Sequence, residues 1–363
     1  MARPTRIEVD ADALRHNVMC VKRCAPGRKI IAMVKANAYG CGVSAVVPAL
    51  DAHVDAFGVA CLEEARVVRQ FTLRPCVLLQ GVFQQKELFE LADAGCEPVV
   101  HHLTQLAWIL ETPLPQALRV WVKVDTGMHR LGFDIKTAIK AIAALKACPW
   151  VLDNLGVMTH LASADEPHNP QNQAQLALFN QLDLSHGLFE RSISNSAAIL
   201  SCPEALADVV RPGIMLYGVS PFSDQTAASL DLKPVMQFIS EITAIHTYAP
   251  GEHVGYGGCW EAKRTSRIGV VAVGYGDGYP RHVAPNTPVF INGLYVPVVG
   301  RVSMDMLTVD LTDFEAARIQ LGTRVELWGQ HLPVERIARA AETIGYELIC
   351  QISPRVREKA VII

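Results

Sequence analysis

Short apolar runs alternate with amphipathic segments as far as Gly218. The apolar runs have the length of strands, and eight of them begin near residues 28, 55, 75, 97, 119, 151, 192 and 209. Helical periodicity lies between them, for example at 63–70, 85–94, 135–147 and 172–184. This alternation predicts a parallel sheet, and eight units about 25 residues apart predict a (β/α)8 barrel. A doubly wound open sheet is the alternative, but the sequence lacks the G-x-G-x-x-G turn that such a sheet usually carries after its first strand.

The pattern changes after Gly218. Residues 220–229 form a polar stretch that contains proline. Beyond it, glycine, proline, tyrosine and β-branched residues replace helical periodicity until a helical pattern returns at 334–345. We therefore predict an α/β barrel domain over 8–228 and a mainly β domain over 229–363.

Composition narrows the class of partner. The chain has 363 residues, is 50% hydrophobic and 19% charged, and carries a formal net charge of -3, so we expect a globular protein that binds a small molecule rather than nucleic acid or a membrane. No secretory signal or bilayer-spanning stretch is evident, which predicts a cytoplasmic protein. Ten scattered cysteines form no C-x-x-C motif and no zinc-spaced set with histidines, so we expect buried thiols and no metal.

An isolated lysine ends the first apolar run of the repeating pattern. In K-I-I-A-M-V-K-A-N-A-Y-G-C-G, at 29–42, Lys35 follows the apolar stretch. At the end of a buried parallel strand such a lysine loses hydration, which disfavours its ammonium form and leaves the amine available as a nucleophile. Schiff-base chemistry requires that state. On position alone, a lysine whose amine simply reaches solvent is the alternative.

The residues around Lys35 resemble the cofactor-lysine motif of bacterial alanine racemases. The match runs through A-x-V-K-A-N-A-Y-G and departs at Cys41, where the family usually has histidine. The resemblance implies an isomerase that binds pyridoxal 5'-phosphate through Lys35 and interconverts L-alanine and D-alanine. It also implies that an N-terminal strand, residues 1–7, joins the mainly β domain.

A second charged group of residues follows the run near residue 119. The segment V-K-V-D-T-G-M-H-R-L-G, at 122–132, contains Lys123, Asp125 and Arg130. A salt-bridged rim is one interpretation. The family resemblance implies instead that Arg130 contacts the substrate carboxylate and the cofactor. It further implies that Lys123 supports Arg130, often as a carbamate formed with carbon dioxide.

The last apolar run carries an arginine at its end. The segment V-V-R-P-G-I-M-L-Y-G, at 209–218, contains Arg211, which could pair with a nearby acid. The resemblance implies a hydrogen bond from Arg211 to the pyridine nitrogen of the cofactor. Because arginine does not readily give up a proton, that nitrogen would stay unprotonated, which favours racemisation over transamination.

Small polar groups predict a phosphate site in the same region. The candidates are the backbone N–H groups of Gly213 and Ile214 and the hydroxyls of Ser196 and Tyr39. The resemblance adds Asn195, in S-N-S-A-A, and His160, in M-T-H-L-A-S-A-D, to the residues that line the cofactor. A lone histidine is otherwise more often a core residue.

Tyr256 is the candidate for a second proton-transfer group. Moving the α-proton between the two faces of a planar carbanion needs a base on each face, or one base able to swing across. Lys35 is tethered to one face, so we expect a second residue on the other. Tyr256, in V-G-Y-G-G, matches the family's second base, which reaches across a homodimer interface. A hairpin aromatic is the alternative interpretation.

The segment G-R-V-S-M-D-M, at 300–306, contributes two further residues. The resemblance places the Met304 backbone against the substrate carboxylate, and Asp305 near the entrance or bracing the site. Pro354 stands where some family members carry a tyrosine that touches the phosphate, so the pocket could be roomier and admit serine.

The segment G-Y-G-D-G-Y, at 274–279, could be taken for a nucleotide loop, but no Lys-Ser/Thr follows it. We predict a β-turn there, with Tyr275 and Tyr279 lining the substrate corridor.

We predict a homodimer with shared active sites, in which two-base proton transfer on a pyridoxal-phosphate aldimine serves peptidoglycan D-alanine supply or breakdown. Lys35 acts on the D face, and Tyr256 of the partner subunit acts on the L face. The alternatives are a broad-specificity racemase that also accepts serine, a barrel decarboxylase and a non-enzymatic pyridoxal-phosphate carrier. A carrier would lack the mainly β domain.

Overall fold

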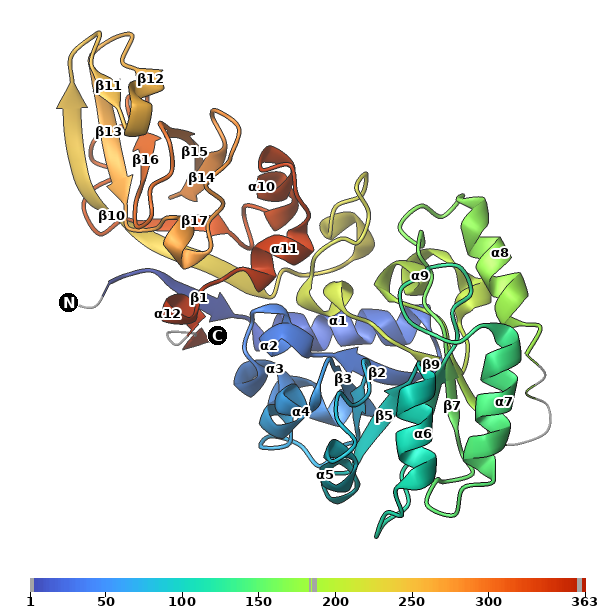
Figure 1. The fold of residues 1–363 in the computed structure, drawn as a ribbon. Coiled ribbons are helices and arrows are strands. Elements are labelled where there is room, and N and C mark those ends of the chain that lie inside the picture. The colour runs from blue at the N-terminus through green and yellow to red at the C-terminus, as the bar shows by residue number, and fades with distance from the viewer. Residues whose placement is uncertain (1–2, 183, 185–187, 358–360) are drawn as a thin grey trace.

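Eight parallel strands close into a barrel in the computed structural model, which describes residues 3–182, 184, 188–357 and 361–363 (Figure 1). The strands are β2 (Lys29–Met33), β3 (Ala56–Val59), β4 (Cys76–Leu78), β5 (Cys96–Val100), β6 (Trp121–Lys123), β7 (Gly156–Met158), β8 (Glu190–Ser192) and β9 (Val209–Val210). Each pairs with the next, and β9 returns to β2 through the pairs Lys29↔Val209 and Ile30↔Val210. The predicted (β/α)8 barrel is confirmed, and the open sheet is excluded.

Helices surround the barrel and connect its strands. They are α1 (Ala11–Cys24), α3 (Val43–Leu50), α4 (Leu62–Val68), α5 (Glu87–Asp93), α6 (Leu103–Glu111), α7 (Ile135–Lys146), α8 (Pro170–Phe179) and α9 (Ser196–Ser201), with 3-10 turns η1 (Asp51–His53), η2 (Pro203–Ala205), η3 (Ile214–Tyr217) and η4 (Ala228–Leu230). Asp10 and Asp134 cap α1 and α7 by accepting from backbone N–H groups. The helix predicted over 172–184 ends at Phe179, and residue 183 lies outside the described residues. No helix in the described ranges is long and apolar enough to cross a membrane.

Large and small side chains alternate inside the barrel. A Cβ atom at Gly156 would lie 2.1 Å from the ring of Trp121, and one at Gly58 would lie 2.0 Å from Met33 Cε. Glycine on one strand therefore leaves the volume that a large side chain of its neighbour fills. The barrel centre is a packed core, which leaves its rim for chemistry.

Most of the remaining strands form one sheet, in the order β13-β16-β15-β14-β17-β10-β1-β18. Their bounds are β1 (Arg6–Val9), β10 (Met236–Tyr248), β13 (Ser266–Val271), β14 (Pro288–Ile291), β15 (Leu294–Val299), β16 (Leu307–Asp310), β17 (Arg324–Trp328) and β18 (Val361–Ile362). Strand β1 pairs antiparallel with β10, so the N-terminal strand belongs to this sheet. We call this sheet, with its turns and a two-stranded ribbon, the β unit. The ribbon consists of β11 (His253–Val254) and β12 (Trp260–Glu261) and lies at the end of the β unit away from the barrel (Figure 1).

The single helix predicted at 334–345 is wrong in detail, because two helices occupy this region. Helix α10 (Val334–Ala340) ends just before Glu342, whose φ of 54° lies in the left-handed region and breaks the helical path. Helix α11 (Gly345–Cys350) then contacts the turn after β2, at the barrel mouth, and α12 (Pro354–Arg357) follows it.

The predicted β-turn at 274–279 is a 3-10 turn, η6 (Tyr275–Asp277), closed by the Asp277 carboxylate, which accepts from the Gly274 N–H at 2.9 Å. Tyr275 is partly exposed, but Tyr279 does not line a corridor. It is 1% exposed and its ring stacks beside that of Trp328 at 6.1 Å, since the turn directs it into the core.

Candidate active site

The barrel residues singled out from the sequence gather at one end of the barrel. They follow the carboxyl ends of five strands: Lys35 after β2, Lys123 at the end of β6 with Arg130 beyond it, His160 after β7, Asn195 and Ser196 after β8, and Arg211 after β9. This is the face on which barrel enzymes build their active sites. Lys123, Arg130 and His160 line one small cavity there.

Lys35 begins a turn of unusual hand, labelled α2 (Lys35–Tyr39). Residues 36 to 39 all have φ between 52° and 53°, and Gly40 follows with a φ of 83°. Successive residues other than glycine rarely adopt this left-handed backbone conformation, so contacts with other parts of the chain must stabilise the turn. The Ala36 N–H donates to Glu64 Oε1 at 2.7 Å, and Asn37 Oδ1 accepts from the Val43 N–H at 2.9 Å.

The Lys35 amine lies in a setting that favours its neutral form. Solvent reaches the side chain at the barrel mouth, yet protein atoms surround it on most sides. Desolvation, and then the positive charge of Arg130, lower the pKa of Lys35, while the Glu64 carboxylate opposes the shift. The amine is therefore both accessible and easier to deprotonate than an ordinary lysine, as the sequence analysis predicts.

Lys123 is buried among cations. Desolvation, followed by the charges of Arg211, Arg130 and Lys35, lowers the pKa of Lys123 to about 7. Among the described residues neither Lys123 nor Arg130 forms an ion pair, so the salt-bridged rim considered above is not found. Asp125 instead accepts from the Gly127 N–H at 2.9 Å. The Asp125 carboxylate is near enough to oppose the lowering of the Lys123 pKa, but the cations around Lys123 outnumber it, which suits an anionic ligand.

Arg211 is buried and hydrogen-bonded to neutral groups. Its guanidinium donates to Ser192 Oγ and to the Thr159 carbonyl oxygen, each at 2.6 Å, and lies 3.3 Å from His160 Nδ1. No acid pairs with it within the described part of the chain, and burial lowers the pKa of Arg211 to about 10. Burial, with the charges of Arg211 and Lys123, holds the pKa of His160 well below its usual value, so its imidazole is neutral.

The predicted phosphate donors lie together, but the Gly213 N–H already has an acceptor within the protein. The Gly213 N–H donates to Ser196 Oγ at 2.8 Å, which uses this N–H but leaves the Ser196 O–H without an acceptor among the described residues. Within the described residues the Ile214 N–H has no partner. Burial raises the pKa of Tyr39, which keeps its hydroxyl protonated as a donor. A Cβ atom at Gly213 would lie 2.5 Å from Tyr39 Oη, so only glycine allows this close approach.

Asn195 has a structural role in addition to its position. Its side-chain oxygen accepts from the Ala198 N–H at 3.0 Å and caps α9. This bond fixes the strand-to-helix turn that presents Ser196.

This donor set fits pyridoxal phosphate. An accessible amine of lowered pKa suits its aldehyde, and a buried guanidinium suits the pyridine nitrogen. Hydroxyl and N–H donors around Tyr39 and Ile214 suit its phosphate. Each donor was predicted from the sequence, and the fold brings all of them to one rim.

Three residues that hold Tyr39 and Lys35 in place were missed by the sequence analysis. The Tyr217 ring stacks on that of Tyr39 at 4.7 Å, and its hydroxyl donates to the Met33 carbonyl oxygen at 2.8 Å. Tyr346, on helix α11 near the C-terminus, also lies beside Tyr39, with ring centroids 6.4 Å apart. Glu64 supports the backbone of the turn. These are contacts between distant segments, and no local pattern announces them.

The residues predicted on the β unit are not brought to the barrel mouth of their own chain. Tyr256 lies in a turn, η5 (Tyr256–Gly258), between β11 and β12, on the ribbon remote from the barrel (Figure 1), and is 70% exposed. Met304 is 53% exposed. Asp305 Oδ1 accepts from Arg355 Nη2 at 2.8 Å. One chain alone therefore separates Lys35 from Tyr256.

Among the described residues, the fold assembles one cluster of possible metal ligands that the sequence analysis did not identify. His16, Cys20 and Asp231 place their ligand atoms within 4.8 Å of one another. Arg23 Nη2 lies 2.9 Å from Cys20 Sγ and also binds the Asp231 carboxylate. A guanidinium already supplies the positive charge there, so the cluster does not point to a metal ion.

A barrel that offers a nucleophilic lysine beside an anion site is the arrangement of a Schiff-base enzyme with a phosphate-bearing cofactor. Residues 9–221 match the family "Alanine racemase, N-terminal domain", and residues 235–360 match "Alanine racemase, C-terminal domain". The chain belongs to the alanine racemase family, whose enzymes depend on pyridoxal phosphate.

Individual alanine racemases are similar to this chain over almost its whole length. The chain is 57% identical to the alanine racemase of Legionella pneumophila (strain Lens) over 360 residues, which is 99% of this chain and 100% of that one. The structure is similar to that of the biosynthetic alanine racemase from Pseudomonas aeruginosa, with a TM-score of 0.94, 43% identity and 99% coverage of each chain. It is also similar to the alanine racemase from Bartonella henselae with covalently bound pyridoxal phosphate, with a TM-score of 0.88, 29% identity and 99% coverage of each chain.

Proposed function

We propose that this protein interconverts L-alanine and D-alanine, and that it does so with Lys35 and Tyr256 as the two proton-transfer groups. The observation that carries the proposal is the accessible Lys35 amine of lowered pKa, set among unpaired cations at the barrel mouth of an alanine racemase family member. When bound, pyridoxal phosphate supplies an electron sink that makes the α-proton of the amino acid acidic.

The barrel residues would hold this cofactor and the substrate. Lys35 would bind the cofactor aldehyde, Arg211 would donate to the ring nitrogen, and Tyr39 with the Ile214 N–H would bind the phosphate. Ser196, Asn195, Gly213 and His160 would complete the lining. Because Arg211 stays charged even with its lowered pKa, it would leave the ring nitrogen without a proton.

Arg130 would orient the substrate carboxylate from the barrel side, and the Met304 backbone would do so from the β unit. Arg130 has no ion-pair partner among the described residues, so its charge is available. Lys123 would support Arg130 as a carbamate, since its pKa of about 7 leaves the neutral amine that carbon dioxide needs. Addition of carbon dioxide to the neutral amine would release a proton and place a negative charge among three cations. A carbon-13 carbamate signal from protein equilibrated with labelled bicarbonate, absent from Lys123→Met, would test this step.

Proton exchange on the second face requires Tyr256 of the partner subunit. Lys35 cannot reach both faces, and Tyr256 of the same chain stands on the far ribbon of the β unit. We therefore propose a homodimer with two shared sites, each combining one chain's barrel with the other chain's β unit. Residues 8–228 would form the barrel domain, and 229–363 with 1–7 the second domain.

The reaction would supply D-alanine for peptidoglycan or begin its breakdown. We propose a cytoplasmic location. All ten cysteines are free thiols in the structure, which suits a reducing compartment.

Serine is the second candidate substrate, and the exposed Pro354 is the observation that favours it. Proline fills less of the entrance than a tyrosine would.

The first experiment measures D-alanine formed from pure L-alanine by purified protein with added pyridoxal phosphate, with Lys35→Ala and Lys29→Ala side by side. Lys29 begins β2, the strand that leads to Lys35, and pairs with Glu190 at the surface, so its variant controls for loss of a lysine. We expect D-alanine from wild type and Lys29→Ala only. A cofactor absorption band that depends on Lys35, without D-alanine, would reject alanine and leave serine, a decarboxylase or a carrier.

A further inference from the structure

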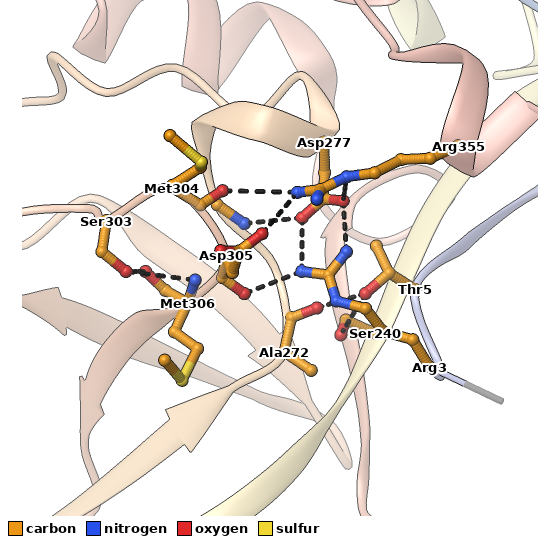
Figure 2. A network of polar contacts seen from close by, with 11 residues as sticks. Arg3, Thr5, Ser240, Ala272, Asp277, Ser303, Met304, Asp305, Met306 and Arg355 are labelled. Atoms are coloured by element: carbon orange, nitrogen blue, oxygen red, sulfur yellow. Dashed lines mark hydrogen bonds and ion pairs between the residues drawn. The ribbon is translucent and has the colours of Figure 1, made fainter. Parts of the chain in front are cut away.

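A polar cluster in the β unit connects four segments that are far apart in sequence. It consists of Arg3, Asp277, Asp305 and Arg355, and we call it the Asp277 cluster (Figure 2). Arg3 binds both carboxylate oxygens of Asp277, at 2.7 Å for the Nη2–Oδ2 contact, and also donates to the Asp305 carbonyl oxygen at 2.7 Å. Arg355 Nε lies 2.8 Å from Asp277 Oδ1.

The cluster joins two arginines to two acids. The Asp277 side chain is fully buried, whereas those of Arg355 and Asp305 are 43% and 49% exposed. Both arginines face the one buried carboxylate of Asp277. Arg355 Nη2 also donates to Asp305 Oδ1 at 2.8 Å, so Arg355 has a second acid as partner. Arg355 thus bridges a buried acid and an acid at the surface.

The same cluster lies against the backbone that carries Met304. The Ser303 carbonyl oxygen accepts from the Tyr275 N–H at 3.0 Å, and the Met304 carbonyl oxygen accepts from the Gly276 N–H at 2.8 Å. A Cβ atom at Gly274 would lie 2.2 Å from the Ser303 oxygen, so glycine is required for this contact. The segment 303–305 is therefore packed backbone to backbone on η6.

This packing decides where two N–H groups point. In a trans peptide the C=O and the following N–H point to opposite sides. Because the carbonyls of Ser303 and Met304 face η6, the N–H groups of Met304 and Asp305 face away from it. Within the described residues neither N–H has a partner. Two adjacent free donors match the two oxygens of a carboxylate.

The Asp305 side chain is the closest competitor for those donors. A carboxylate next to two free N–H groups can accept from them itself and would also repel an incoming carboxylate. Arg355 holds the Asp305 oxygen on the other side, toward Asp277 (Figure 2).

We infer that Arg355 is a positioning residue: by holding the Asp305 carboxylate against the Asp277 cluster, it keeps the Met304 and Asp305 N–H groups free for the carboxylate of the amino-acid substrate. The inference rests on the proposed function, in which Met304 meets that carboxylate. It adds the Asp305 N–H as a second donor and gives Arg355 a role in substrate affinity without contact with substrate.

The test compares Arg355→Gln with Arg324→Gln. Arg324 binds Glu8 at 2.8 Å in the same sheet and touches none of the 303–306 segment, so its variant makes the same change of charge elsewhere. For Arg355→Gln we expect KM for L-alanine to rise about tenfold with kcat within about threefold, because the released Asp305 carboxylate would occupy the two N–H groups and repel the substrate carboxylate. Arg324→Gln should keep the wild-type KM, and both should keep the cofactor absorption band.

Two further variants separate positioning from general support. Arg355→Lys should recover part of the lost affinity, because lysine keeps the charge but cannot bridge two carboxylates in the same way. Adding Asp305→Asn to Arg355→Gln should lower KM again, because the competing charge is gone. An unchanged KM in Arg355→Gln would overturn the inference, as would a rise of equal size in Arg324→Gln. A double variant no better than Arg355→Gln would overturn the competition with Asp305.

A structural readout keeps this test separate from the proposed function. Hydrogen exchange of the Met304 and Asp305 amides should be slower in Arg355→Gln than in wild type, because the released Asp305 carboxylate accepts from them, and unchanged in Arg324→Gln. If wild type failed to racemise alanine, the proposed function would be lost, and this exchange pattern would still decide whether Arg355 holds the Asp305 carboxylate away from these amides. Equal exchange in all three proteins would reject the positioning role.

Discussion

The proposed site has a barrel half and a β-unit half, and they differ in how far a single chain buries their functional side chains. On the barrel, Arg211 is 4% and Lys123 8% exposed, and burial lowers the pKa of both. On the β unit, Tyr256 is 70% and Met304 53% exposed. Folding of one chain completes the barrel half, whereas the β half presents its groups outward to a surface that the same chain does not provide.

This contrast separates two requirements of the chemistry. Cofactor binding needs shielded donors and shifted pKa values, which a packed barrel rim provides. Proton delivery to the opposite face needs a group carried on a different body, so that both faces of the substrate are covered. The contrast predicts that damage to each half has a different signature.

The largest expected effect comes from the β half. Tyr256→Phe removes the hydroxyl and should lower turnover in both directions by about 10²- to 10⁴-fold, the usual range for loss of a positioned acid or base. The cofactor absorption band should remain, because the barrel half is intact. Tyr295→Phe, at an exposed tyrosine of β15, is the control and should stay close to wild type. Undiminished turnover in Tyr256→Phe would remove this residue from its role.

The next test mixes the two inactive variants. If sites are shared, subunits of Lys35→Ala and Tyr256→Phe that exchange at equal concentration form hybrids with one intact site. Random pairing makes half of the dimers hybrid, so about a quarter of wild-type activity should return. The measurement is racemisation after subunit exchange, with each variant alone as the baseline. Activity that stays at the baseline despite hybrid formation would place both residues in one chain's site.

A smaller effect concerns Lys123 and pH. Its pKa is about 7 in the folded protein and near 10.5 when unfolded, so between these values the unfolded chain binds more protons. The free energy of unfolding should then rise with pH in this window, by up to about 1.4 kcal/mol per pH unit, relative to Lys123→Met. Denaturant titrations at pH 7, 8 and 9 in bicarbonate-free buffer measure it, with exposed Lys29→Met as control. A difference that does not change with pH would contradict the lowered pKa.

The smallest effect concerns Cys41, where the family motif is broken. The side chain is fully buried behind the Lys35 turn, and burial raises the pKa of its thiol. Cys41→Ala should cost about 1 kcal/mol of unfolding free energy through lost packing and change kcat less than about twofold. Thermal unfolding and initial rates check this, with exposed Cys259→Ala for comparison. A large loss of kcat in Cys41→Ala would give the thiol a part in the chemistry.

The sequence predicted correctly those features of the fold that follow from local patterns of apolar and polar residues. Eight apolar runs separated by helical periodicity determine a barrel, and residues just beyond those runs, such as Lys35 and Arg211, must then share its rim. The family motifs supplied their chemical roles, which periodicity alone does not.

The failures have a common physical origin in long-range contacts. The left-handed backbone at Ala36 depends on Glu64, and the burial of Tyr279 depends on packing against Trp328. The break between α10 and α11 depends on a single left-handed residue, Glu342. Asp277 appeared to be an ordinary turn residue, because its arginine partners lie near the two ends of the chain.

The left-handed turn after Lys35 has a consequence for the lifetime of the protein. Four successive residues in this conformation cost about 1–2 kcal/mol each, a large share of the 5–15 kcal/mol that typically stabilises a folded domain. A ligand that binds only the folded turn offsets this cost by mass action. We therefore expect the cofactor-free protein to open first at this turn and to be degraded faster. Under vitamin shortage, a cell would then lose activity twice, through empty sites and through a shrinking pool of enzyme.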